Sequence, residues 1–267
     1  MDMDNDRRLA RARTFDEIAE LYDRVRPYYR EELFDDLFDY AGIAPSAARI
    51  LEIGPGPGRA TEPLARRGAE IVGIELGANL ARIARDKLSR FPRVRIVNAN
   101  FETWELDGLF DIVFAATAWH WIDPKRRYAL AGRALRPGGV LAFAQGTHAF
   151  PPDVDPFFLQ IQDAYLKIGL PWPGPWPPPP PEEMRDSCAE IAASGLFEDV
   201  QAIRSLWTAE YDADSHVALM STASDHRLLE ESKREYLFSE MRRLIAARPG
   251  RRITKHELMV LHLARKR

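Results

Sequence analysis

The most constraining feature of this 267-residue chain is a short apolar strand that runs directly into a glycine-rich turn. Residues 50–58 read Ile-Leu-Glu-Ile-Gly-Pro-Gly-Pro-Gly. Glycine reaches positive φ without a steric penalty and lets a ligand approach the backbone closely. At the carboxyl end of a parallel strand, such a turn is where α/β sheets bind nucleotide-like cofactors. The stretch therefore predicts an α/β fold with a cofactor site after its first strand.

From residue 49 onward, apolar strands and amphipathic helices alternate. We predict strands at 49–53, 70–75, 94–98, 110–115, 140–145, 199–211 and 253–263. We predict intervening helices at 61–67, 79–90, 124–135, 182–194 and 228–247. This alternation indicates a Rossmann-like, doubly wound α/β fold with seven mostly parallel strands and helices on both faces. A single domain over residues 1–267 fits the length of the chain.

Two segments stand outside this alternation. Residues 14–42 contain two helical stretches broken at Arg26-Pro27, and we expect them to form an N-terminal helical lid. Residues 150–181 contain a helical piece at 157–168 and then eight of the chain's 20 prolines between 171 and 181. Such a run suits a linker, a ligand for an SH3-type domain, or an extended cap segment. The tryptophans within it and the resumed alternation after it favour an inserted cap.

Composition excludes several classes of protein. The single Cys188 excludes a disulfide framework and a cysteine-rich zinc site, and we expect no metal. The net charge of −3 argues against a general nucleic-acid binder. No apolar run is long enough for a membrane span and the amino terminus lacks an apolar signal segment, so we expect a cytoplasmic protein. Basic residues 248–255, including Lys255, are expected to form a solvated turn before an edge strand.

The glycine-rich turn departs from the dinucleotide-binding fingerprint, which requires glycine where Arg59 stands. Its spacing, E-x-G-x-G-x-G, resembles motif I of the class I S-adenosylmethionine (SAM)-dependent methyltransferases. Residues at and after the later strands also resemble motifs of that family, in order: Glu75, 98–102, 110–113 with 118–121, and 135–139. The pattern from Phe15 to Tyr29 is similar to a small-molecule group that includes trans-aconitate methyltransferase-like proteins.

The resemblance implies SAM as cofactor and assigns residues to it. These expected cofactor contacts are Glu52, Gly54, Gly56, Gly58, Glu75, Leu76, Asn100 and Phe101. Glu75 would accept hydrogen bonds from both ribose hydroxyls. Asn100 stands where the family usually has the aspartate that accepts from the adenine amino group. The glycines would leave room for the methionine part, and Glu52 would help orient its ammonium group.

The resemblance also implies a small-molecule acceptor, with neither a nucleic-acid nor a membrane partner, and a monomer or homodimer. His120 is the expected catalytic base, because imidazole has a pKa of ~6.5 and the residue follows the fourth strand. Trp119 and Trp121 either wall the acceptor pocket or pack at the strand end. Further candidate acceptor contacts are Tyr22, Arg26, His148, Trp172 and Trp176. Arg26 would hold a carboxylate, and His148 is a competing base.

The reaction implied is an in-line displacement at the methyl group of SAM, which leaves the protein to align the acceptor and exclude water. Three alternatives remain open at this point. One is a non-catalytic SAM-binding module, a second is a nicotinamide-dependent oxidoreductase, and a third is a nucleic-acid methyltransferase.

Overall fold

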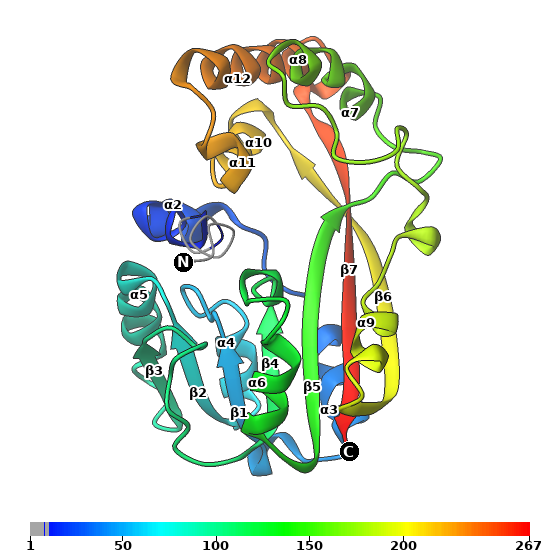
Figure 1. Ribbon diagram of the computed structural model, residues 1–267. Helices are drawn as coiled ribbons and strands as arrows, with labels where there is room; N and C mark the ends of the chain where they lie inside the picture. The colour runs from blue at the N-terminus through cyan, green and yellow to red at the C-terminus, as the bar shows by residue number, and fades with distance from the viewer. Residues whose placement is uncertain (1–7, 9–10) are drawn as a thin grey trace.

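The fold is built on one seven-stranded sheet. The computed structural model describes residue 8 and residues 11–267 (Figure 1). The strands are β1 (Arg49–Ile53), β2 (Glu70–Glu75), β3 (Val94–Asn98), β4 (Phe110–Ala116), β5 (Leu135–His148), β6 (Phe197–Tyr211) and β7 (Ile253–Lys266). They lie in the order β3-β2-β1-β4-β5-β7-β6, and only β7 runs antiparallel to its neighbours. The predicted Rossmann-like fold is thus confirmed.

Helices connect these strands and cover the sheet. Their bounds are α2 (Ala19–Val25), α3 (Glu31–Ala41), α4 (Thr61–Arg66), α5 (Ala78–Leu88), α6 (Arg127–Ala134), α7 (Phe157–Gln160), α8 (Gln162–Lys167), α9 (Cys188–Ala193), α10 (Ala213–Met220), α11 (Ser224–Arg227) and α12 (Glu231–Ala246). None of the helices in the described part of the chain has the length and apolarity to cross a membrane.

Each face of the sheet has its own apolar core. On one face, Phe34 and Leu37 of α3 and Leu64 of α4 pack against the central strands. On the other, α6 and α9 cover residues such as Val113 and Phe143 (Figure 1). All seven residues of β4 are buried, which is the pattern of a strand covered on both faces.

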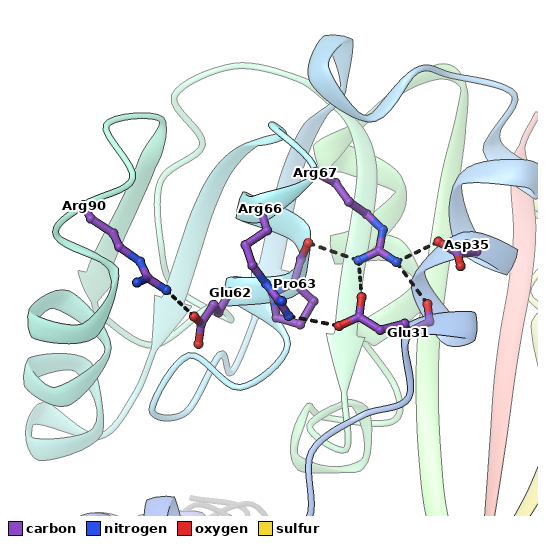
Figure 2. Close-up of polar contacts among 7 residues, drawn as sticks. All are labelled: Glu31, Asp35, Glu62, Pro63, Arg66, Arg67 and Arg90. Carbon is purple, nitrogen blue, oxygen red and sulfur yellow. Dashed lines mark hydrogen bonds and ion pairs between the residues drawn. The ribbon is translucent and has the colours of Figure 1, made fainter.

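Ion pairs tie α3 to the end of α4 at the edge of the first core. Arg67 donates to Glu31 Oε2 at 2.6 Å and to Asp35 Oδ1 at 2.7 Å, and Arg66 donates to Glu31 Oε1 at 2.9 Å (Figure 2). These contacts lie at the surface, where such pairs contribute little stability individually. They connect the first turn of α3 to the end of α4.

The long strands β5, β6 and β7 continue beyond the rest of the sheet and carry a second lobe formed by α7, α8, α10, α11 and α12 (Figure 1). Its core includes Phe157 and Phe158 of α7 and Leu237 and Met241 of α12. The expected cap segment at 150–181 supplies only α7 and α8 of this lobe. Residues 213–227, for which the sequence suggested no element, supply α10 and α11. The helix predicted at 182–194 begins only at Cys188.

The last strand is not at an edge, contrary to our expectation. β7 lies between β5 and β6, with Met259 opposite both Gly146 and Ser205. Lys255, expected in a solvated turn, belongs to β7, pairs with Ala209 of β6 and is only 8% exposed. Its side chain is shielded from solvent because it faces a cavity that Leu219 and Met220 of α10 also line.

Phe34 provides a test of the first core. Its ring is fully buried and lies 6.4 Å from that of Phe114. We expect Phe34→Ala to lower the free energy of unfolding by about 3–5 kcal/mol, because it leaves a cavity. Leu166→Ala, at a side chain that is 62% exposed, should change it by less than about 0.5 kcal/mol. Urea unfolding measures both, and similar losses in the two variants would contradict this description of the core.

Candidate functional site

The main cavity, of about 390 Å³, opens at the carboxyl ends of the parallel strands. Its walls come from the turns that follow β1, β2, β3 and β4 and from the N-terminal segment. The expected site residues that line it are Tyr22, Arg26, Gly54, Gly56, Glu75, Leu76, Asn100, Phe101, His120 and Trp121. The volume falls in the range of small-molecule sites, about 300–1,000 Å³.

The three glycines of the turn after β1 serve different purposes. All have positive φ, at 64° for Gly54, 56° for Gly56 and 87° for Gly58. A Cβ on Gly54 would lie 2.7 Å from Ala118 Cβ, whereas one on Gly56 would meet nothing within 4 Å. Gly58 does not line the cavity, since a Cβ there would lie 2.9 Å from a side-chain carbon of Leu88 in α5. Gly58 thus allows helix packing, and Gly54 and Gly56 face the cavity.

The carboxylate of Glu75 holds this turn in place. Its Oε2 accepts the N–H of Gly56 at 2.8 Å and its Oε1 accepts the N–H of Gly77 at 2.8 Å. Burial raises the pKa of Glu75, and these two backbone donors oppose that rise. Each carboxylate oxygen has a second lone pair, so Glu75 can accept two further hydrogen bonds from a ligand in the cavity.

The turn after β3 is braced in a similar way. Asn98 donates through Nδ2 to the carbonyls of Glu75 and Leu76 at 2.9 and 3.0 Å. Asn100 Oδ1 accepts the N–H of Glu102 at 3.0 Å, so one acceptor position of its amide is used within the turn. The remaining lone pair and the amide N–H groups of Asn100 can face a polar ring edge.

Glu52 lies beneath the glycine-rich turn and is only 1% exposed. Neither of its carboxyl oxygens has a hydrogen-bond partner among the described residues. It lines a narrow pocket of about 30 Å³ that Gly54 and Gly56 also line. Burial raises the pKa of Glu52 to about 8, and the Glu75 carboxylate adds to that rise, while the Thr61 hydroxyl opposes it. A cationic ligand group near this carboxyl would compensate its burial.

Arg59, the residue that replaces a fingerprint glycine, fastens the N-terminal segment to the turn. Its guanidinium donates to the carbonyl of Asp23 at 2.7 Å and to the carbonyl of Arg26, and it lies 3.9 Å from the ring centre of Tyr28. Arg26 in turn donates to Thr222 Oγ1 at 2.8 Å and to the Thr222 carbonyl at 3.0 Å. The segment is therefore held between the sheet and the second lobe.

A second cavity of about 230 Å³ adjoins the main one. Tyr22, Arg26, Thr117 and Gly146 line both cavities, and we call the strand ends at Thr117 and Gly146 the passage. Thr117 has φ of 54°, a conformation that is costly for a β-branched residue and that concentrates at functional sites. Its hydroxyl lies 2.9 Å from that of Tyr29.

The residues expected around the acceptor separate into two groups. His120 and Trp121 line the main cavity, and desolvation together with Arg127 and Arg11 lowers the pKa of His120 to about 4. His148 lines the second cavity instead, where burial lowers its pKa to about 2. Trp119 lines neither cavity, because it is fully buried and stacks on Phe143 at 4.8 Å.

The two tryptophans of the proline-rich segment also lie outside both cavities. The rings of Trp172 and Trp176 pack against Phe150 at 5.1 and 5.5 Å. The sequence interpretation, conversely, overlooked Thr117, Lys255 and Glu257. The Lys-His-Glu order at 255–257 was the available signal, since it places two opposite charges on one face of a strand. No group of His, Cys, Asp and Glu within the described ranges could hold a metal ion.

Part of the chain is similar in sequence to known methyltransferases. Residues 51–143 match a family described as a methyltransferase domain. An uncharacterised methyltransferase of Mycobacterium tuberculosis H37Rv is 34% identical over 126 residues, which are 47% of this chain and 49% of that protein. A trans-aconitate 2-methyltransferase of Rhodopseudomonas palustris BisB18 is 34% identical over 140 residues, covering 47% of this chain and 53% of that one. The chain thus spans about half the length of the curated relatives it matches.

Solved structures show the same fold over most of the chain. A proposed type II methyltransferase from Anaeromyxobacter dehalogenans has a TM-score of 0.62 at 22% identity, covering 90% of this chain and 97% of that one. Phosphoethanolamine N-methyltransferase 2 of Haemonchus contortus, solved with phosphomonomethylethanolamine and S-adenosylhomocysteine, has a TM-score of 0.54 at 17% identity. That match covers 97% of this chain and 59% of that chain.

The buried carboxyl of Glu52 predicts a pH dependence of stability. Its folded-state pKa of about 8 is above the usual 4.5, so its protonated form stabilises the fold and that stabilisation is lost as pH rises from 4.5 to 8. We expect Glu52→Gln to be more stable than wild type by a few kcal/mol at pH 8.5, since one pH unit corresponds to about 1.4 kcal/mol. Near pH 5 the two should differ little.

Urea unfolding between pH 5 and 9 measures this difference. Glu105→Gln, at an exposed carboxylate, is the matched control and should follow wild type throughout. Parallel stability curves for Glu52→Gln and wild type would show that the Glu52 carboxyl does not titrate in this range.

Proposed function

We propose that the protein transfers a methyl group from SAM to a small-molecule acceptor, and the match of residues 51–143 to a methyltransferase domain supports this proposal. The main observation in support is the set of side chains that meet at the carboxyl ends of β1 and β2. There Glu75 offers acceptors for ligand hydroxyls. Gly56 leaves open space, and Glu52 provides a buried carboxyl for a cation.

These residues fit the chemistry of SAM. Glu75 accepts from the ribose hydroxyls through the lone pairs that Gly56 and Gly77 leave free. Glu52 has no hydrogen-bond partner among the described residues, and the methionine ammonium lowers its pKa, so that the ionised carboxylate compensates the ammonium charge. Leu76 and Phe101 line the same cavity as Asn100 and provide apolar contacts for the adenine, whose amino edge Asn100 binds.

SAM supplies a methyl group that is already activated on a sulfonium, so the work of the protein is to align the acceptor and exclude water. Tyr22 and Trp121, which line the main cavity, shield the reacting groups. The N-terminal segment, fastened by Arg59 to the turn, acts as the lid over the cofactor. A hydroxyl or amine acceptor must lose a proton, for which His120 is the proposed base, whereas a carboxylate acceptor needs no base.

The small size of the acceptor is supported by the second cavity, of about 230 Å³, and by the relative named trans-aconitate 2-methyltransferase. The direct test is a screen with tritiated-methyl SAM over carboxylates, phenols and amines. Label should appear in a small-molecule product. Saturable SAM binding without transfer to any acceptor class would instead indicate a binding module.

Replacing Glu75 tests the cofactor site. We expect Glu75→Gln to weaken S-adenosylhomocysteine binding about tenfold to a hundredfold, because hydrogen bonds to a charged group contribute about 1.5–3 kcal/mol. Glu105→Gln, on an exposed side chain, serves as the control and should bind as wild type does. Isothermal titration calorimetry gives both affinities, and equal affinities would remove Glu75 from the cofactor site.

Replacing His120 tests the proposed base. With a hydroxyl acceptor, His120→Ala should lower kcat by about 10²–10⁴-fold and leave the affinity for S-adenosylhomocysteine within about twofold. Because the pKa of His120 is about 4, the imidazole is already neutral at pH 6. The rate of wild type should fall only as the pH approaches 4, with no inflection near 6.5. Unchanged turnover in the variant would exclude His120 as the base.

A further inference from the structure

The second cavity has a built polar end that nothing in the cofactor site explains. Lys255 of β7 lines it and is only 8% exposed. The ammonium of Lys255 donates a hydrogen bond to the carboxylate of Glu257, which also lines the cavity. Burying a charged lysine is costly, and burial lowers its pKa while Glu257 opposes that effect. A buried lysine that lines a cavity is therefore a candidate for contact with a ligand.

The position of this pair follows from the register of β7. Met259, which lies opposite Gly146 at the passage, shares a strand face with Glu257 and Lys255 because side chains alternate along a strand. Lys255 is four residues from Met259, or about 13 Å along the strand backbone. The cavity thus has one end at the passage and another at the ion pair.

The charges of the cavity do not balance. Its charged lining residues are Arg26, Arg59, Lys255 and Glu257. Arg59 forms an ion pair with the carboxylate of Asp23 at 3.8 Å, and Lys255 is paired with Glu257. Arg26 donates only to the uncharged Thr222 among the described residues. The cavity therefore carries the equivalent of one uncompensated positive charge.

The rest of the lining is mostly apolar and aromatic. Its apolar and aromatic members are Pro27, Tyr28, Tyr29, Trp207, Leu219, Met220, Leu258 and Met259, with Tyr22 between the two cavities, and its uncharged polar members are Thr117, Thr147 and the neutral His148. Such walls favour a ring or a branched hydrocarbon. They provide few donors for additional anionic groups, each of which would be desolvated without a partner.

We propose that the second cavity is the acceptor site, and that it selects a small molecule with an apolar or aromatic body and a single anionic group held by Arg26 and Lys255. The reacting end of the acceptor lies at the passage, beside Thr117 and Gly146. This inference rests on the proposed methyl transfer and adds the class of acceptor. It differs from a tricarboxylate site, for which one uncompensated charge is too few.

Calorimetric titration of the S-adenosylhomocysteine-loaded protein tests this proposal. The probes are 4-hydroxyphenylacetate, its neutral amide and trans-aconitate, which carry one, no and three negative charges at neutral pH. We expect the monoanion to bind at least about tenfold more tightly than the amide, in line with a charge-assisted hydrogen bond, and more tightly than trans-aconitate. Equal binding of acid and amide, tighter binding of trans-aconitate, or no saturable binding of the acid would overturn the proposal.

Two variants assign the effect to the ion pair. Lys255→Met combined with Glu257→Gln removes both charges without leaving either one unpaired, and should weaken binding of the acid at least about tenfold while leaving the amide unchanged. Glu257→Gln alone frees Lys255 and should tighten binding of the acid, which a purely structural pair would not do. Lys233→Met, at an exposed lysine of α12, is the matched control. Unchanged acid binding in the first two variants contradicts the assignment.

Failure of this proposal can be distinguished from failure of the proposed function. S-adenosylhomocysteine is titrated first into wild type and each variant, and all should bind it with similar affinity. If wild type does not bind it, the proposed function fails, and the acid and amide are then compared in the unloaded protein. If it binds while the acid and amide do not differ, only the acceptor class is wrong.

Discussion

The two hydrogen bonds that the Glu75 carboxylate accepts from Gly56 and Gly77 determine the shape of the cofactor end of the sheet. They join the turn after β1 to the turn after β2, so neither can move independently. Gly56 takes its positive φ and donates to Glu75 without the conformational cost that a side chain would add. The cavity walls, the free lone pairs of Glu75 and the buried Glu52 carboxyl all depend on this arrangement.

A second set of contacts joins the sheet to parts of the chain far away in sequence. Arg59 binds the carbonyl of Arg26, and the side chain of Arg26 binds Thr222, which is 196 residues further along. The N-terminal segment is thereby placed at the boundary between the two cavities. In Figure 1, α2 accordingly lies between the sheet and the helices of the second lobe. In the proposed reaction, the contacts from Arg59 through Arg26 to Thr222 separate the cofactor from the acceptor everywhere except at the passage.

The sequence was sufficient for the features that depend on local pattern. Strand β1, its glycine-rich turn and the placement of Glu75 follow from apolar runs and glycine spacing, and the seven-stranded fold is confirmed. It was insufficient where burial depends on distant pairing. Lys255 belongs to a basic stretch that is usually solvated, and it is buried by its pairing with β6 and by helix α10 of the second lobe, which lines the same cavity. Likewise, adjacent aromatic residues gave no means to predict that Trp121 faces the cavity while Trp119 packs on Phe143.

The central claim is that the cavity beside Glu75 is built for SAM and not for a dinucleotide. The most direct test is calorimetric titration of wild-type protein with S-adenosylhomocysteine and, separately, with NAD⁺. Our account predicts saturable binding of one S-adenosylhomocysteine per chain and no detectable binding of NAD⁺. Binding of NAD⁺ with no response to S-adenosylhomocysteine would contradict it.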